Sequence, residues 1–107
     1  MMKDWTSGDI QKAIEQHETF ALYLYTPMCG TCQVAAKMLT VVKEIRKGTA
    51  FAQINVNYAQ ETVLQHQIES VPCLLLFKRG IMVKKLYAFQ SVPYLNELIS
   101  RHLGGNE

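Results

Sequence analysis

The sequence predicts an α/β domain in which a mixed central sheet of four to five strands carries helices on both faces. Two observations lead to this prediction. Segments with strand-like apolar patterns alternate with segments of helical periodicity, and two strand-like segments near the C-terminal end are joined by a two-residue turn. Strands separated by helices are expected to pair in parallel through right-handed crossovers, whereas a hairpin pairs antiparallel. The length of 107 residues suits a single domain over residues 1–107.

The first part of the chain predicts a short helix followed by a buried strand. Thr6 and Asp9 resemble a capping box, which places the start of a helix over about residues 8–17. Residues 20–25 are apolar at successive positions, as expected of a strand that is covered on both faces. Residues 2–4 give a weak signal for an additional short strand.

A long helix follows the buried strand. Pro27 ends the strand, and from Cys32 onward apolar residues recur at steps of three and four positions. We expect this helix to end near Gly48, because a glycine suits a C-terminal cap. The apolar stripe consists of Ala35, Met38, Leu39, Val42 and Ile45.

The second half of the chain predicts three strands and two helices. In chain order we expect a strand at 50–57, a weaker helix at 59–67, a strand at 73–77 and its hairpin partner at 81–89. Arg79 and Gly80 form the hairpin turn. Ser91 can cap a last helix with Pro93 in its first turn. The inner face of that helix is expected to carry Leu95, Leu98, Ile99 and Leu103.

Composition and charge exclude several classes of function. The formal net charge is only +2 and the basic residues are scattered, so we expect no nucleic-acid partner and no anionic membrane surface. No apolar run approaches the about 20 residues that span a bilayer. The N-terminal residues lack the apolar core of a signal peptide, so we expect a cytoplasmic protein with reduced thiols. Three cysteines are an odd number, which does not make a disulfide framework.

Cys29 and Cys32 lie at the predicted junction between a strand and the long helix. The unpaired N–H groups and the positive end of the helix dipole favour a thiolate at the first position. Cys32 lies one turn further along the same side and is expected to be more buried. This asymmetry suits a two-step exchange in which Cys29 attacks a partner's disulfide and Cys32 closes an internal bond.

Two other interpretations of the pair remain open from its spacing. Half of a zinc site is one, although a tetrahedral site needs four ligands. The further candidates for such a site are Cys73, His17, His66 and His102. Two inert thiols are the other interpretation.

Two motifs in this order resemble the thioredoxin family. One is "CGTC" at residues 29–32, between a buried strand and a long helix, and the other is "SVPCLLLFKRG" at residues 70–80. The resemblance covers nearly the whole chain. It implies the thioredoxin fold and disulfide exchange with protein partners, with an upstream thiol reductase and without a cofactor or metal. We further expect a monomer.

The resemblance also implies roles for individual residues. Cys29 matches the attacking cysteine and Cys32 the resolving cysteine, with Gly30 and Thr31 supporting the site between them. Pro72 matches a cis-proline that faces the pair. The residues expected to contact substrate are Met28, Val71 and Tyr87, and the neighbouring Tyr25 and Phe89 extend the candidate surface.

Several positions depart from the family's pattern. Met28 stands in place of a tryptophan, Thr31 and Lys37 in place of prolines, Tyr23 in place of a buried acid, Gln53 in place of a lysine and Tyr87 in place of a groove glycine. Tyr23 is a poor base near pH 7, because an unperturbed tyrosine has a pKa of about 10. Tyr87 is expected to narrow the substrate groove or to offer a stacking surface.

Cys73 directly follows the proline of the second motif. It is either a small buried residue at the start of a strand or a third redox thiol. The positions that depart from the family's pattern leave two alternatives to protein disulfide exchange. One is a binding module that holds zinc or an iron–sulfur cluster. The other is a glutaredoxin-like enzyme that acts on low-molecular-weight mixed disulfides.

Overall fold

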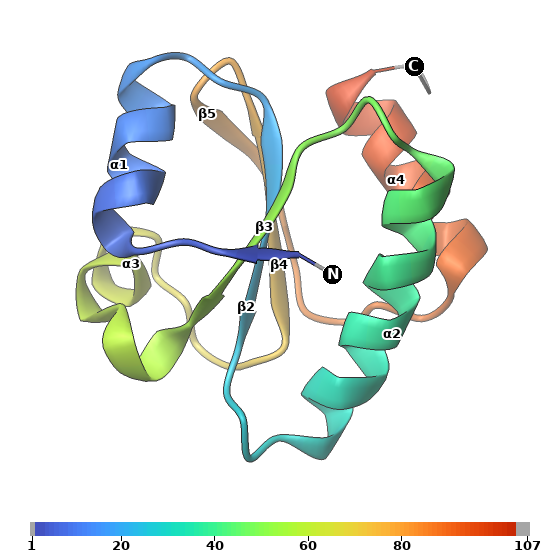
Figure 1. The fold of residues 1–107 in the computed structure, drawn as a ribbon, viewed down its shortest axis with the longest axis horizontal. Coiled ribbons are helices and arrows are strands. Elements are labelled where there is room, and N and C mark those ends of the chain that lie inside the picture. The colour runs from blue at the N-terminus through green and yellow to red at the C-terminus, as the bar shows by residue number, and fades with distance from the viewer. Residues whose placement is uncertain (1, 105–107) are drawn as a thin grey trace.

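The computed structural model describes residues 2–104, in which one five-stranded sheet is covered by helices on both faces (Figure 1). The elements are β1 (Lys3–Asp4), α1 (Ser7–Glu15), β2 (Phe20–Tyr25), α2 (Gly30–Ile45), β3 (Phe51–Asn55), the 3-10 helix η1 (Val56–Tyr58), α3 (Gln60–Gln65), β4 (Cys73–Lys78), β5 (Ile81–Leu86) and α4 (Val92–Leu103). The strand order is β1-β3-β2-β4-β5. Helices α1 and α3 lie on one face, and α2 and α4 on the other. The predicted mixed sheet with helices on both faces is confirmed.

The direction of β4 differs from the prediction. β1, β3 and β2 are parallel, but β4 runs antiparallel to β2, so the prediction that it would join the sheet in parallel was wrong. The reason lies in the connection between β3 and β4, which contains only η1, the six-residue α3 and a loop. This connection returns to the end of the sheet where β3 finishes, so Cys73 pairs with Leu24 near the end of β2. The antiparallel pairing therefore brings the start of β4 to the edge from which α2 begins.

The side chains on the two faces of β2 belong to two separate hydrophobic clusters. Ala21 and Tyr23 point to the cluster under α2 and α4, whereas Leu22 and Leu24 point to the cluster under α1 and α3. Successive side chains of a strand point to opposite faces, so a strand between two helical layers must be apolar at every position. Phe20 to Leu24 are all buried, which confirms the interpretation of this segment.

The C-terminal end of α2 differs from the prediction. The helix ends at Ile45 with Arg46 as its C-cap, and Gly48 does not cap it. The Arg46 side chain is 1% exposed and donates to Ser100 Oγ and to the carbonyl oxygen of Gly104. We attribute the early end to this anchored side chain. Ile45, which we expected on the buried stripe, is 44% exposed because it lies beside the face that packs on the sheet.

The predicted helix starts are confirmed. Thr6 and Asp9 form a capping box at α1, and the Ser91 side chain accepts from the backbone N–H of Tyr94 at α4. The predicted strand at 50–57 is shorter because Asn55 caps η1 with its side chain and turns the chain out of the sheet. Within residues 2–104, no helix combines the length and the apolar character needed to cross a bilayer.

Candidate active site

The cysteine pair lies at the junction between the end of β2 and the start of α2. Cys29 is the N-cap of α2, and it is joined by a disulfide to Cys32, with the two Cα atoms 5.1 Å apart. The two residues differ in exposure, since Cys29 is half-buried while Cys32 is only 3% exposed. One sulfur of the pair is therefore open to a partner, and the other lies behind it in the first turn of the helix.

Two donors surround the sulfur of Cys29. The backbone N–H of Cys32 donates to Cys29 Sγ at 3.1 Å, in the manner of an N-cap side chain. The Thr31 hydroxyl lies 3.4 Å from the same sulfur. Apart from its chain neighbours and the backbone of α2, a Cβ added at Gly30 would meet no atom of residues 2–104 within 4 Å, so other parts of the fold do not cover the pair on this side.

The Tyr23 side chain contacts the backbone of Cys32. Its hydroxyl donates to the carbonyl oxygen of Cys32 at 2.5 Å, and its ring packs edge-on against Phe89. Burial raises the pKa of Tyr23 to about 12, so this residue is neutral at physiological pH. Gln53, in place of a lysine, donates instead to Asp4 Oδ1. Tyr23 therefore does not act as a base near pH 7: its hydroxyl keeps its proton and donates a hydrogen bond to the backbone of Cys32.

Pro72 lies at the same edge of the sheet as the cysteine pair. The Val71–Pro72 peptide bond is cis, and Pro72 directly precedes Cys73, which pairs with Leu24. A hollow of about 380 Å³ lies between Pro72 and the first turns of α2. Its lining residues are mainly apolar: Thr31, Val34, Ala35, Met38, Pro72, Tyr87, Phe89 and Gln90.

Tyr87 and Val34 both line this hollow, but the sequence analysis identified only Tyr87. The Tyr87 hydroxyl accepts from the backbone N–H of Glu69 at 3.2 Å, which ties the side chain to the loop before Pro72. Val34 was missed by the sequence analysis, although it is an exposed apolar residue two positions after Cys32. Val34 could have been identified from the sequence, because it is an apolar residue of the helix that lies outside the buried stripe.

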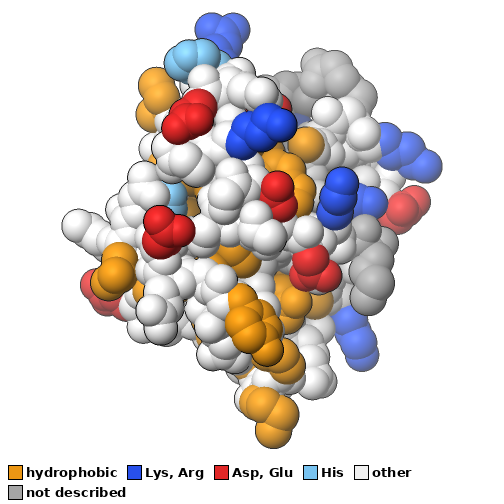
Figure 2. Space-filling model, turned by 60° about the vertical axis from the view of Figure 1, so that its left-hand side comes forward, with side chains coloured by type: hydrophobic (Ala, Val, Ile, Leu, Met, Phe, Trp, Pro, Cys, Tyr) orange, Lys and Arg blue, Asp and Glu red, His pale blue; other side chains and the backbone are white. Residues whose placement is uncertain are grey.

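Met28 precedes Cys29 and is 96% exposed. Figure 2 shows charges of both signs interspersed over the face in view, while hydrophobic side chains gather at its lower end, where the β2–α2 connection lies in Figure 1. An exposed apolar side chain next to a half-buried cysteine is a natural contact for a protein partner.

Two candidate residues have surroundings other than the hollow beside Pro72. Cys73 is fully buried in the cluster under α1 and α3, and burial raises the pKa of its thiol to about 12. Tyr25 donates to Asp4 Oδ1 at 3.1 Å and lines a different hollow, together with Tyr58. Neither residue lines the hollow beside Pro72.

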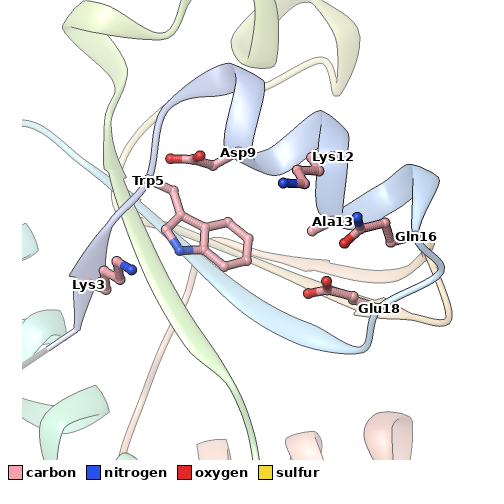
Figure 3. Close-up of a pocket in the computed structure, with 7 residues that line it drawn as sticks. All are labelled: Lys3, Trp5, Asp9, Lys12, Ala13, Gln16 and Glu18. Atoms are coloured by element: carbon pink, nitrogen blue, oxygen red, sulfur yellow. The ribbon is translucent and has the colours of Figure 1, made fainter.

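A further hollow of about 260 Å³ lies beneath α1 (Figure 3). The Trp5 ring extends under the helix there, among side chains of both charges such as Lys12 and Glu18. This hollow shares no residue with the one beside Pro72. Among residues 2–104, no group of three or more His, Cys, Asp and Glu side chains is placed to hold a metal ion.

This sheet has a bridged cysteine pair at the start of α2, and a cis-proline before β4 lines the same hollow as the first turns of that helix. These features define the class of thioredoxin-like proteins. Comparisons with known proteins agree. Residues 2–101 match the family model described as Thioredoxin. The thioredoxin-like protein YusE of Bacillus subtilis is 56% identical over 97 residues, which cover 84% of this chain and 92% of YusE. The thioredoxin of Alicyclobacillus acidocaldarius is 33% identical over 86 residues, or 79% of this chain and 82% of that protein.

Solved structures show the same fold. A mutant thioredoxin of Halobacterium salinarum superposes with a TM-score of 0.82 at 22% identity, covering 99% of this chain and 90% of that one. The oxidised thioredoxin of Plasmodium falciparum gives the same TM-score and identity, covering 97% of this chain and 100% of that one. The chain belongs to the thioredoxin family. With its disulfide-forming pair, it is a thiol–disulfide oxidoreductase.

Proposed function

We propose that this protein exchanges disulfides with protein partners, with Cys29 as the attacking residue and Cys32 as the resolving residue. The observation that carries the assignment is the difference in exposure: Cys29 is half-buried at the mouth of α2, whereas Cys32 is 3% exposed. A partner's sulfur reaches the first position more easily than the second. The helix N-terminus and the N–H of Cys32 also stabilise negative charge on Cys29.

In the proposed reaction, the Cys29 thiolate attacks one sulfur of the partner's disulfide. The partner's S–S bond breaks, its other sulfur leaves as a thiolate and takes up a proton, and a mixed disulfide joins Cys29 to the partner. Cys32 then loses its proton and attacks Cys29 Sγ. The partner departs with two thiols, and the protein holds the Cys29–Cys32 disulfide, so the partner is reduced by two electrons and the pair is oxidised by two.

The surroundings of the pair support a protein substrate. The exposed Met28 and the apolar hollow beside Pro72 flank Cys29, and both suit the side chains of an extended peptide. By resemblance, the backbone of Val71 pairs with that peptide. Tyr87, held by its bond to Glu69, forms one wall of the hollow and would contact the substrate's side chains. On the side of Gly30, other parts of the fold within residues 2–104 do not cover the pair.

The test compares two single variants. We expect Cys32→Ser to accumulate a mixed disulfide with a protein disulfide substrate, because the second step cannot occur. Cys29→Ser is the matched control and should trap none. Equal trapping through both cysteines, or none through either, would contradict the proposed roles. Stoichiometric zinc or iron in the purified protein would instead favour a metal-binding module.

The proposed cycle also requires a reductant for the Cys29–Cys32 disulfide. We assign this step to an upstream thiol reductase in a reducing cytoplasm, with the protein acting as a monomer. The expected result is that a cytoplasmic thiol reductase system restores two free thiols to the oxidised protein. A sedimentation measurement that gives a stable dimer would contradict the monomer assignment.

A further inference from the structure

A second hollow, of about 320 Å³, opens at the carboxyl ends of the parallel strands. Its lining includes the last residue of each of these strands: Asp4 of β1, Asn55 of β3 and Tyr25 of β2. The chain leaves β2 toward α2 on one face of the sheet and leaves β3 toward η1 and α3 on the other (Figure 1). Strand ends that diverge in this way leave a crevice between them, and open α/β sheets commonly bind ligands there.

Asp4 supplies the charge of this hollow. Among the lining residues, all of them within residues 2–104, no other side chain is acidic or basic. Tyr25 and Gln53 both donate to Asp4 Oδ1, at 3.1 and 3.0 Å, and no described residue donates to Oδ2. Lys3 lines the hollow beneath α1 instead, because successive side chains of a strand point to opposite faces. The Asp4 carboxylate is therefore held by two neutral donors and keeps one oxygen for a ligand.

Two tyrosines line the same hollow. The Tyr58 side chain, at the end of η1, is 86% exposed, so its ring is open to a partner. The Tyr25 ring is held by stacking on Tyr23, with the ring centroids 5.6 Å apart. The face of an aromatic ring attracts a cation, and a planar guanidinium can stack on a ring while it donates to a carboxylate. One carboxylate with two tyrosines and no basic side chain therefore suits an arginine.

We propose that this hollow, called here the Asp4 hollow, binds an arginine side chain of the protein partner and so favours partners with an arginine near the exchanging cysteine. The inference rests on the proposed function and names a chemical feature of its substrates. The Asp4 carboxylate accepts hydrogen bonds from the guanidinium, and the ring of Tyr58 contacts the guanidinium face.

The Asp4 hollow is within reach of a partner that is bound to Cys29. Tyr25 precedes Cys29 by four residues, so their Cα atoms are at most about 14 Å apart. In the strand order β1-β3-β2-β4-β5, the Asp4 hollow adjoins the strands on one side of β2, and Pro72 precedes β4 on the other side. An extended chain rises about 3.3 Å per residue, so an arginine about three positions from the partner's cysteine can span this distance with its long side chain.

The test uses two symmetric peptide disulfides, each made from a short peptide with one cysteine. The positions three before and three after the cysteine hold arginine in one peptide and citrulline in the other. Citrulline has nearly the shape of arginine but carries no charge. We expect the reduced protein to exchange the arginine peptide about five- to tenfold faster at low ionic strength. In about 0.5 M salt the ratio should fall to about two, because salt screens the charge of an exposed carboxylate.

Four variants locate the preference. Asp4→Asn keeps an acceptor for Tyr25 and removes the charge, whereas Tyr58→Ser removes the ring. We expect each of these two to lower the ratio of the arginine rate to the citrulline rate to about two or less. The matched controls are Tyr58→Phe, which keeps the ring, and Glu97→Gln, which removes an exposed charge in α4. Both controls should keep the ratio of the unchanged protein.

Three outcomes would overturn the inference while the proposed function stands. The two peptides are exchanged at equal rates, or the ratio survives both Asp4→Asn and Tyr58→Ser, or Glu97→Gln lowers it as much as Asp4→Asn does. In each case, exchange of the citrulline peptide still supports disulfide exchange with protein partners.

The proposed function fails instead if neither peptide is exchanged. The Asp4 hollow is then tested without exchange chemistry, by NMR titration of the oxidised protein with N-acetylarginine amide. The backbone signals of Asn55 and Tyr58 should shift in the unchanged protein and shift much less in Asp4→Asn. No shift in the unchanged protein, or equal shifts in both proteins, would overturn the inference.

Discussion

The hydroxyl of Tyr23 and the carbonyl oxygen of Cys32 form a hydrogen bond of 2.5 Å inside the protein. It joins the middle of β2 to the first turn of α2, directly beneath the disulfide. Because burial raises the pKa of Tyr23 to about 12, the hydroxyl keeps its proton over the range in which thiols exchange. We therefore regard Tyr23 as a residue that positions the backbone of Cys32.

Tyr23→Phe should separate positioning from proton transfer. The variant loses one buried hydrogen bond, and we expect it to lower the free energy of unfolding by about 1 kcal/mol. The rate of disulfide exchange at pH 7 should change by less than about threefold, since a neutral tyrosine is no base at that pH. Stopped-flow exchange with a protein disulfide and urea unfolding measure the two effects. A hundredfold loss of rate with unchanged stability would show that the hydroxyl takes part in the chemistry.

Met28 offers a test of whether the partners are proteins or small disulfides. Its side chain is 96% exposed, so Met28→Ser should leave the free energy of unfolding within about 0.5 kcal/mol. Exchange with a protein disulfide should slow several-fold because an apolar contact beside Cys29 is lost. Exchange with glutathione disulfide should be unaffected, since it does not need that contact. Equal slowing with both substrates would favour a glutaredoxin-like activity.

Local patterns in the sequence were sufficient to predict most of the elements and the cysteine pair. The capping box at Thr6 and the apolar run of β2 depend on neighbours within a few positions, and both predictions are confirmed. The antiparallel direction of β4 depends on where a connection returns, and the end of α2 depends on a contact between Arg46 and Ser100 in a distant helix. Such long-range contacts leave no periodic signal in the chain.

In the candidate site, too, the features set by neighbouring residues could be predicted from the sequence, whereas those set by long-range contacts could not. The start of α2 at the cysteines is encoded locally, because Pro27 ends the strand and the helical stripe begins soon afterwards. The hollow beside Pro72 brings together α2 and the segment after β5, so no short stretch of sequence predicts its outline. The contact between Tyr87 and Glu69 is equally non-local.

Cys73 provides a direct test of the hypothesis of a third redox thiol. The residue is fully buried, and its pKa is raised to about 12, so little thiolate forms at pH 8. We expect less than a few per cent of Cys73 to react with iodoacetamide in the folded oxidised protein over an hour, and complete reaction in denaturant. Mass spectrometry of the digested protein gives both values. Rapid labelling in the folded state would support a redox role.

The same burial predicts a loss of stability at alkaline pH. The Cys73 thiol has a reference pKa of 9.0 and a pKa of about 12 in the folded protein. Above pH 9 the unfolded chain gives up this proton while the folded chain keeps it, so stability falls as pH rises toward 12. Between about pH 7 and pH 10.5 the loss from this group should be about 2 kcal/mol. Urea unfolding measures the change.

Cys73→Ala is the comparison for this prediction. A background of Cys29→Ser and Cys32→Ser prevents disulfide exchange during unfolding. The alanine variant should lose less stability than its parent over the same pH interval, because it lacks the group that titrates. Parallel curves for the two proteins would mean that Cys73 ionises equally in both states.

Arg46 links the ends of two helices, and its removal should destabilise the fold without touching the site. The side chain is 1% exposed and donates to Thr49 Oγ1, Ser100 Oγ and the carbonyl oxygen of Gly104. Arg46→Met keeps much of the apolar stem but leaves these acceptors without their donor, so the free energy of unfolding should fall by about 2–3 kcal/mol. The matched control is Arg101→Met, which removes an exposed arginine 3.7 Å from Glu97 and should lower the free energy of unfolding by less than about 0.5 kcal/mol.

Urea unfolding measures the effect on stability, and the rate of disulfide exchange in the folded fraction measures the effect on the site. Equal stability of the two variants would mean that solvent replaces the donors of Arg46, whereas a loss of exchange in folded Arg46→Met would mean that the anchor also shapes the far end of α2.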